Sequence, residues 1–177
     1  MTKHLGKKDW FIAGLDILEK YGSIKVNIEN LCCSLGVTKG SFYHHFENID
    51  GYTSSLLDFW LEENTLKIIR EADGAESEKP LVLMNLVSCL RHNAELHIRV
   101  WSFSNAIVRE FVARADQIRL DYLTNILVQM GYDSSTAKDE ALIDYATLVG
   151  IQQLCPEMPT DEWNRLQEKY SKIGGFI

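Results

Sequence analysis

The sequence predicts an all-α protein of ordinary globular composition. Of its 177 residues, 46% are hydrophobic and 24% are charged, enough apolar material for one or two small cores. The prolines stand at Pro80, Pro156 and Pro159, so two long stretches contain no proline to break a helix. In those stretches apolar side chains recur every three or four residues, which is the spacing of a helix and not of a strand.

The first fifty residues predict one longer helix and two short ones. The longer helix covers about residues 8–21, and Gly22 follows it as the glycine that ends it. Asn27 and Thr38 each precede a short helix as its N-cap, the first ending near residue 34 and the second near residue 45. The expected inward-facing residues of the first two helices are Phe11, Gly14, Leu15, Leu18, Ile28, Leu31 and Cys32.

The rest of the chain also reads as helices. Asn48 is the predicted N-cap of a fourth helix that ends near Gly74, and charged and small residues from there to Pro80 predict a loop. Gly131 is expected to end a later helix and Ser134 to cap the next one. The further helices are expected over residues 80–96, 99–130 with a break near 102–105, 134–154 and 161–173.

The charge of the chain is unevenly distributed. The net charge is −7, but the residues through Asp50 include six basic and six acidic side chains and are neutral together. The whole deficit therefore lies after Asp50, which predicts two domains with different roles, residues 1–50 and 51–177. Lys and Arg drive the binding of phosphate groups, so the net charge of the chain argues against a nucleic-acid partner. The neutral charge of the first domain does not exclude that this domain binds a nucleic acid.

The sequence contains no membrane or metal signal. No stretch approaches the roughly 18 apolar residues of a membrane span, and no signal peptide is readable, so we expect a soluble, cytoplasmic protein. Its four cysteines form no C-x-x-C pair and are expected to pack as reduced thiols, with no metal and no cofactor. They are Cys32, Cys33, Cys89 and Cys155.

One segment carries a specific functional signal. A helix followed by two short helices that a glycine turn joins is the layout of a helix-turn-helix, whose second short helix lies in the major groove of DNA. Leu35-Gly36-Val37 would form the turn, and Phe42 and Phe46, four residues apart, would pin the second helix to the bundle. Gly40 costs about 1 kcal/mol in helix propensity, so we expect two backbones to approach closely there.

The same segment resembles a known family. From Phe11 to about Leu57 the sequence is similar to the N-terminal domain of tetracycline-repressor (TetR) family transcription regulators. That family has an A-x-x-L-F-x-x-x-G first helix and, further on, the string G-V-[ST]-x-G-x-[LF]-Y-x-H-F. All defining positions of the second string are matched by Gly36-Val37-Thr38-Lys39-Gly40-Ser41-Phe42-Tyr43-His44-His45-Phe46. The resemblance implies a homodimeric regulator, a repressor in our interpretation, that binds a near-palindromic operator in double-stranded DNA.

The resemblance also implies which residues contact DNA. Four of them would face the groove, His45 would contact a phosphate or brace the fourth helix, and Asn27 would cap its helix and touch the DNA backbone. The alternative for each is a solvated surface residue. The complete predicted set is Asn27, Thr38, Lys39, Gly40, Ser41, Tyr43, His44 and His45, of which Lys39, Ser41, Tyr43 and His44 are the groove-facing four.

Two positions depart from the family pattern, and both departures remove positive charge. Ile49 stands where many relatives have Lys, and Glu29 stands where an Arg often follows the cap of the second helix. Helix N-termini after Asn27 and Asn48 still offer amide donors to phosphates. Lysines on the flank could contribute as well, namely Lys3, Lys7, Lys8 and Lys25. We therefore expect DNA binding with a modest dependence on salt.

The second domain is expected to bind a ligand and to pair subunits, as the resemblance implies. Small residues at Ala146 and Gly150 would allow another helix to approach closely, as in a subunit contact. The predicted dimer-interface residues are Ala141, Tyr145, Leu148, Gln152, Trp163, Leu166 and Tyr170, for which an intrachain core is the alternative. The predicted walls of a pocket for an unknown small-molecule effector are Trp60, Met84, Trp101, Phe103 and Tyr122, for which plain core is the alternative.

Two other classes of function were weighed. An enzyme is disfavoured because the chain lacks Glu-x-x-His pairs, phosphate-binding glycine loops, G-x-S-x-G and H-E-x-x-H. The polar residues Arg91, His92, Glu95, His97 and Arg99 form a cluster that we interpret as surface and not as a metal site. An interaction protein that keeps the fold without binding an operator is the second alternative, since Ile49 and Glu29 both weaken the positive surface.

Overall fold

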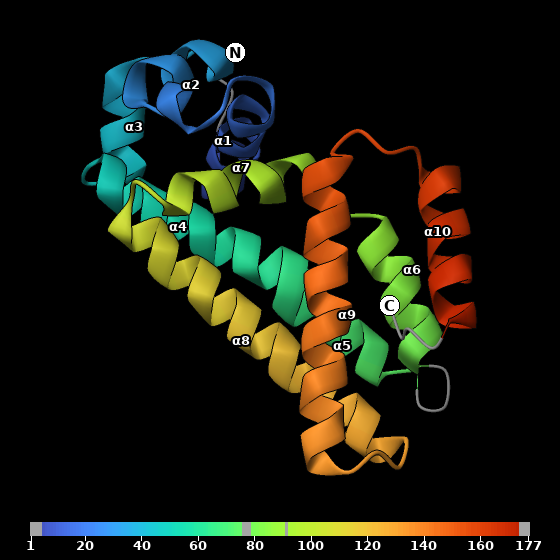
Figure 1. Ribbon diagram of the computed structural model, residues 1–177. Coiled ribbons are helices and arrows are strands. Elements are labelled where there is room, and N and C mark those ends of the chain that lie inside the picture. The colour runs from blue at the N-terminus through green and yellow to red at the C-terminus, as the bar shows by residue number, and fades with distance from the viewer. Residues whose placement is uncertain (1–4, 76–78, 91, 174–177) are drawn as a thin grey trace. The chain divides into compact units, whose positions relative to one another are not determined.

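The computed structural model describes residues 5–75, 79–90 and 92–173, and every regular element in these residues is a helix (Figure 1). The all-α prediction is confirmed. The chain divides into two compact units, which are described separately. The first runs through Trp60 and takes in Asn93–Val112, and the second holds Leu61–His92 and the chain from Ala113 onward.

The first unit contains the predicted N-terminal helices with nearly the predicted bounds. Its elements are α1 (Lys7–Tyr21), a 3-10 turn (Ser23–Lys25), α2 (Ile28–Leu35), α3 (Lys39–His45), α4 (Ile49–Leu61), α7 (His92–Ser102) and the first residues of α8 (Ala106–Gln129). Gly22 ends α1 with φ +74°, a backbone conformation that only glycine adopts without strain. The Asn48 side chain accepts a hydrogen bond from the Gly51 amide (2.8 Å), as expected of the N-cap of α4.

Aromatic rings form the core of the first unit. Trp10 of α1 meets the ring of Phe42 edge-on at 5.6 Å between centroids, and Phe46 meets Tyr52 of α4 in the same way at 5.0 Å. The Tyr52 hydroxyl donates a buried hydrogen bond to the Trp10 carbonyl (2.9 Å). A Cβ on Gly14 would lie 1.9 Å from that hydroxyl, so α1 and α4 can pack this closely only with glycine at that position.

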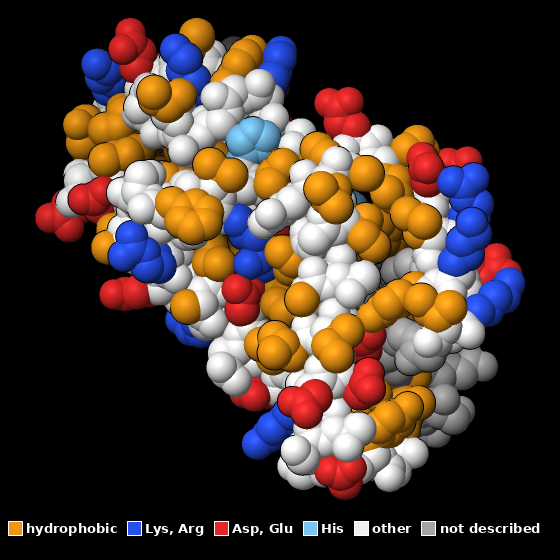
Figure 2. All heavy atoms as spheres, viewed as in Figure 1, with side chains coloured by type: hydrophobic (Ala, Val, Ile, Leu, Met, Phe, Trp, Pro, Cys, Tyr) orange, Lys and Arg blue, Asp and Glu red, His pale blue; other side chains and the backbone are white. Residues whose placement is uncertain are grey.

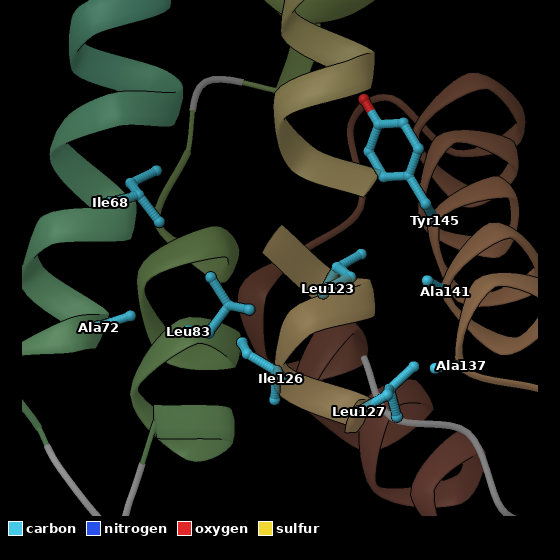
Figure 3. Packing of buried hydrophobic residues seen from close by; sticks show 9 residues of the cluster. All are labelled: Ile68, Ala72, Leu83, Leu123, Ile126, Leu127, Ala137, Ala141 and Tyr145. Atoms are coloured by element: carbon cyan, nitrogen blue, oxygen red, sulfur yellow. The ribbon is translucent and has the colours of Figure 1, made fainter. Parts of the chain in front are cut away.

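The second unit packs the remaining helices around an aliphatic core. Its elements are a π turn (Glu62–Leu66), α5 (Lys67–Asp73), α6 (Lys79–Ser88), the rest of α8, α9 (Ser134–Leu154) and α10 (Thr160–Lys172). The π turn and α5 continue the helical rod that begins with α4, so the fourth predicted helix is confirmed as one long helical region. Four helices meet in the core (Figure 3), which consists of Ile68, Ala72, Leu83, Leu123, Ile126, Leu127, Ala137, Ala141 and Tyr145.

One predicted helix differs from the structure, and one predicted helix break agrees with it. The helix expected over residues 80–96 is wrong, because the chain turns after Ser88 and α7 runs straight through residues 97 and 98. Tight bonds of the i→i−3 type mark this turn, from the Cys89 amide to the Leu86 carbonyl (3.2 Å) and from the Leu90 amide to the Val87 carbonyl (3.1 Å). The break near 102–105 is confirmed, and the Asn105 side chain there accepts from the Val108 amide (3.2 Å) at the start of α8.

The cap of α9 is also corrected. Asp133 and not Ser134 is the N-cap, since its Oδ1 accepts from the amides of Ser135 (3.0 Å) and Thr136 (3.1 Å). Gly131 precedes it with φ +101°, which fits the predicted end of the helix before. Part of the predicted loop from Gly74 to Pro80 lies outside the described residues, as does Arg91 of the polar cluster. Within the described part of the chain, no helix combines the length and apolar character needed to cross a membrane.

Candidate nucleic-acid interface

The short helices α2 and α3 form the predicted helix-turn-helix. Gly36 ends α2 in the left-handed region (φ +68°), and the Val37 amide reaches back to the Cys32 carbonyl (3.0 Å). At its other end, α2 is capped by Asn27, whose Oδ1 accepts from the Asn30 amide (2.9 Å). The turn is therefore defined at both ends by the local chemistry that the sequence indicated.

Helix α3 has one buried face and one exposed face. Phe42 is fully buried and Phe46 is nearly so, which anchors α3 against Trp10 in α1. On the opposite side Tyr43 is 57% exposed and meets Phe42 edge-on at 5.6 Å between centroids, so the ring stands on its own helix. The exposed residues of the predicted DNA-contacting set are Thr38, Lys39, Gly40, Tyr43 and His44, and Ser41 is half-buried.

Within the described residues, no packing contact requires a glycine at position 40. A Cβ added there would meet only Thr38 Oγ1, at an ordinary 3.6 Å. The expected close approach of a second backbone is therefore not made within the described residues. The missing side chain instead leaves open surface on the exposed side of α3, where a molecule bound to that side could come near the backbone.

Two of the other predicted DNA-contacting residues, His45 and Asn27, also make contacts within the chain. The half-buried ring of His45 lies 6.1 Å between centroids from Trp10 and 6.0 Å from Phe46, so His45 packs on α1. Asn27 is half-buried and uses its side chain as the cap of α2. Thr38 stands at the N-cap position of α3, but its side chain makes no capping hydrogen bond. The Thr38 hydroxyl is thus not committed to the helix.

The charges near this surface are sparse. Glu29 is exposed in the first turn of α2, and Ile49 is half-buried at the start of α4. Lys8 and Lys25 are exposed, the Lys7 ammonium lies 5.7 Å above the Phe46 ring, and Lys3 lies outside the described residues. Single lysines and the helix N-termini are therefore the positive groups that this part of the chain can offer to a phosphate.

The buried cysteine behind this surface behaves as an apolar group. Burial raises the pKa of the Cys32 thiol above its ordinary value, and the Lys39 ammonium opposes this with a smaller effect. The thiol is therefore neutral at physiological pH. All four cysteines are free thiols, but only Cys32 is buried. The expectation that they pack as small apolar groups is therefore wrong for Cys33, Cys89 and Cys155, which are exposed.

Comparison with known proteins identifies the fold. No protein-family model matches the sequence, and no curated protein is significantly similar to it. Among solved structures, a transcriptional regulator from Rhodococcus sp. Rha1 is similar with a TM-score of 0.77 and 15% identity, over 96% of this chain and 95% of that one. A TetR transcriptional regulator from Legionella pneumophila is similar with a TM-score of 0.73 and 12% identity, over 96% and 99% of the two chains.

The chain has the TetR fold. A candidate transcriptional regulator from Saccharomonospora viridis, solved in complex with choline, shares it with a TM-score of 0.71 and 16% identity, over 95% of this chain and 96% of that one. The structural likeness extends beyond the helix-turn-helix to nearly the whole of each chain. The TetR resemblance seen in the N-terminal motif therefore holds for the complete fold.

Within the TetR fold, the predicted pocket residues are divided between the two units. Trp60 is fully buried in the first unit, and Phe103, also in the first unit, is 84% exposed after α7. Trp101 and Met84 are half-buried, the former in the first unit and the latter in the second. Tyr122 of the second unit donates a hydrogen bond to Asp73 (3.1 Å), and burial together with that carboxylate raises its pKa to about 12. A role for these residues as the walls of an effector pocket stays a prediction.

Most predicted interface residues pack inside the second unit. Ala141 and Tyr145 belong to its core, Gln152 bonds the ring of His92 (2.8 Å), and Trp163 stacks on the same ring at 4.9 Å between centroids. These four side chains are buried within the chain, which is the alternative that the sequence left open. Three residues keep some exposed surface and remain predicted interface residues, namely Leu148, Leu166 and Tyr170.

The histidines of the predicted polar cluster are not solvated surface side chains. His92 is half-buried between Gln152 and Trp163, and His97 Nδ1 lies 2.9 Å from the Asn93 carbonyl oxygen. Glu95 is buried and pairs with Arg99 (2.9 Å). Among the described residues, no three His, Cys, Asp or Glu side chains are grouped so that they could hold a metal ion. The polar side chains of α7 therefore make packing and hydrogen-bond contacts that periodicity alone did not indicate.

Proposed function

We propose that this protein is a DNA-binding transcriptional regulator of the TetR type that reads a near-palindromic operator as a homodimer. One observation carries the proposal: α3 is fixed to the core through Phe42 and presents Lys39, Tyr43 and His44 on its exposed side. An ammonium, a phenol and an imidazole on one short helix can bond both base edges and phosphates. We assign the protein a binding role in the cytoplasm and no catalysis.

The dimer follows from the geometry of DNA. A protein that reads two half-sites on one face of DNA needs two recognition helices about 34–36 Å apart, which a two-fold dimer supplies. Helix α9 offers a surface for such a contact, because its Leu142 and Ile143 are 56% and 55% exposed and Leu154 is 83% exposed. Ala146 and Gly150 lie between them, and Figure 2 shows apolar side chains gathered over α9.

This α9 surface refines the predicted interface. Ile143, Ala146, Gly150 and Leu154 recur at intervals of three or four residues and so share one side of the helix. A Cβ added at Gly150 would meet nothing within 4 Å, so that position is open to another helix. We propose that the partner subunit packs on this side of α9, which is opposite to the side that carries Ala141 and Tyr145 of the core.

Regulation is proposed to act by occupancy. A repressor needs only to cover a promoter, and an effector that prefers one arrangement of the dimer changes operator affinity by that preference. The choline found in the Saccharomonospora viridis protein is a property of that protein. For this chain we propose a small-molecule effector without assigning its chemistry.

Enrichment of genomic fragments by the purified protein tests the proposal. We expect one short sequence with two-fold symmetry and half-sites about one helical turn, or a multiple of one, apart. Titration of that fragment across salt concentrations should give a modest slope, because the first unit brings few lysines to the DNA. Enrichment of no sequence would favour the alternative function, an interaction protein that has kept this fold.

A further inference from the structure

The helical rod from Ile49 to Asp73 changes its winding at one place. Between α4 and α5 lies a π turn, Glu62–Leu66, in which the Lys67 amide bonds the Glu62 carbonyl five residues back. A π turn holds one residue more than an α turn, and such turns often occur at functional sites. The division between the two compact units falls beside it, between Trp60 and Leu61.

Side chains of the second unit hold this turn from the inner side. Arg119 of α8 donates from Nε to Thr65 Oγ1 (3.0 Å) and from Nη2 to the Asn64 carbonyl (3.3 Å). Its Nη1 donates to the hydroxyl of Tyr145 on α9 (3.0 Å), and that hydroxyl donates to Asp116 (2.6 Å). Thr65 and Tyr145 are buried, so these bonds are sheltered from water.

An ion pair on the outer side matches the same winding. Glu62 pairs with Arg70, eight positions later. In an uninterrupted α-helix, side chains eight positions apart differ in direction by about 80°, whereas seven positions differ by only about 20°. Because the π turn contains one extra residue, Glu62 and Arg70 have about the same relative direction as two residues seven positions apart in an α-helix. The inner bonds and the outer ion pair therefore favour the same register of the rod.

We propose that Arg119 is a register lock, which means that its bonds to Thr65 and Asn64 hold the π turn in its present register. We propose further that breaking these bonds alters operator binding. With Arg119 withdrawn from Thr65 and Asn64, the turn can rewind toward a regular helix. One residue of register rotates the two parts of the rod against each other by about 100°. In this way, a signal that draws Arg119 away changes the orientation of α3, the proposed recognition helix. This inference rests on the proposed function, since its output is operator affinity.

The first test replaces Arg119 and measures both the turn and the DNA. Arg119→Met keeps an unbranched, largely apolar stem of similar length to that of arginine and removes the guanidinium with all its donors. We expect amide exchange at Glu63–Lys67 to accelerate at least tenfold and operator Kd to change at least fivefold, the lower end of typical allosteric coupling. Arg119→Lys, which retains the charge but not the fork of donors, should have an intermediate effect.

Matched variants separate the lock from general instability. Arg165→Met removes an exposed arginine that pairs with Glu162 on α10, and it should change neither readout. Leu123→Ala destabilises the same unit through its core, so acceleration by Arg119→Met must exceed that seen in Leu123→Ala. Unchanged exchange at Glu63–Lys67, or faster exchange with unchanged operator Kd, would overturn the proposal.

A deletion gives the second test. Removal of Asn64 takes the additional residue out of the turn, and we expect a helical, folded protein whose operator affinity differs at least fivefold from wild type. A folded deletion variant with wild-type operator affinity would overturn the switch. If wild type binds no DNA at all, the proposed function fails, whereas amide exchange in Arg119→Met still decides whether the lock exists.

Discussion

At the scale of single residues, the two glycines Gly14 and Gly40 show the difference between structural and functional need. Gly14 lies against the Tyr52 hydroxyl, where a Cβ would come within 1.9 Å. Gly40 lies on the surface, where a Cβ would touch only Thr38 at 3.6 Å. One glycine is therefore required by the fold, whereas the other is open to a bound partner.

Alanine at these two positions should have opposite effects. Gly14→Ala should lower the free energy of unfolding by about 1–3 kcal/mol, because it pushes Tyr52 from its bond to Trp10. Gly40→Ala should raise it by up to about 1 kcal/mol through helix propensity, yet weaken operator binding because a methyl group fills the open surface. Urea titrations and DNA titrations of both variants measure this. A destabilised Gly40→Ala protein would contradict the assignment.

The Tyr52 phenol predicts a loss of stability in alkali. Burial raises its pKa well above the ordinary value near 10. Above pH 10 the unfolded chain releases this proton while the folded chain retains it, so the free energy of unfolding falls as pH rises. Below pH 10 the contribution is complete. Tyr52→Phe should show a shallower fall between pH 10 and 11 in chemical unfolding. An equal fall in both proteins would assign the effect to other groups.

At the scale of elements, the helices with strong local signals were predicted well and those without were not. Helix α3 was found because a capping position, a glycine turn and two phenylalanines four residues apart all agree. The turn after Ser88 carries neither glycine nor proline, so no local signal predicts the end of a helix there. The turn comes just before the point between His92 and Asn93 where the chain passes from one compact unit to the other, a tertiary feature that no local pattern encodes.

The predicted interface residues of α9, namely Ala141, Tyr145, Leu148 and Gln152, lie together on the side of the helix that packs inside the second unit, for a related reason. Apolar residues surround this helix, with Ala141 and Tyr145 in the core and Leu142 and Ile143 on the surface. Periodicity identifies an apolar stripe, but when a helix has apolar residues on two sides it cannot say which side faces the chain's own core. The two sides of α3 are easier to tell apart, because phenylalanines occupy the buried side and residues with polar groups occupy the exposed side.

The corrected cap of α9 can be tested directly. Asp133→Ala should lower the free energy of unfolding by about 1 kcal/mol, because two amides at the start of α9 lose their acceptor. Ser134→Ala serves as the control and should change it by less than about 0.5 kcal/mol, since that residue is not the cap. Chemical unfolding of both variants gives the values. Equal losses, or a larger loss in Ser134→Ala, would restore the original prediction.

At the scale of the whole molecule, the acidic charge and the candidate DNA-contacting residues belong to different parts of the chain. The net charge of −7 arises entirely beyond Asp50, whereas the candidate DNA-contacting residues all precede it. The net charge of the whole chain therefore does not describe the candidate DNA-binding surface. If the proposed function holds, the geometry of α3 and the pairing of two subunits must supply much of the affinity for DNA.

Pairing through α9 makes a separate prediction. Ile143→Glu would bury a carboxylate in the proposed subunit contact, so the variant should sediment as a monomer while its unfolding transition remains cooperative. Leu81→Glu, which places the same charge on an equally exposed residue of α6, should leave the dimer intact. Dimeric Ile143→Glu protein at micromolar concentration would mean that the subunits meet elsewhere.

The affinity of the enriched operator for Lys39→Ala and Tyr43→Ala tests the central claim most directly. Each variant should lose about 1–3 kcal/mol of binding free energy, roughly 5- to 150-fold in Kd, with an unchanged unfolding transition. Lys172→Ala, at the exposed end of α10, is the control and should bind as wild type. Wild-type affinity in both Lys39→Ala and Tyr43→Ala would contradict the assignment of α3 as the recognition helix.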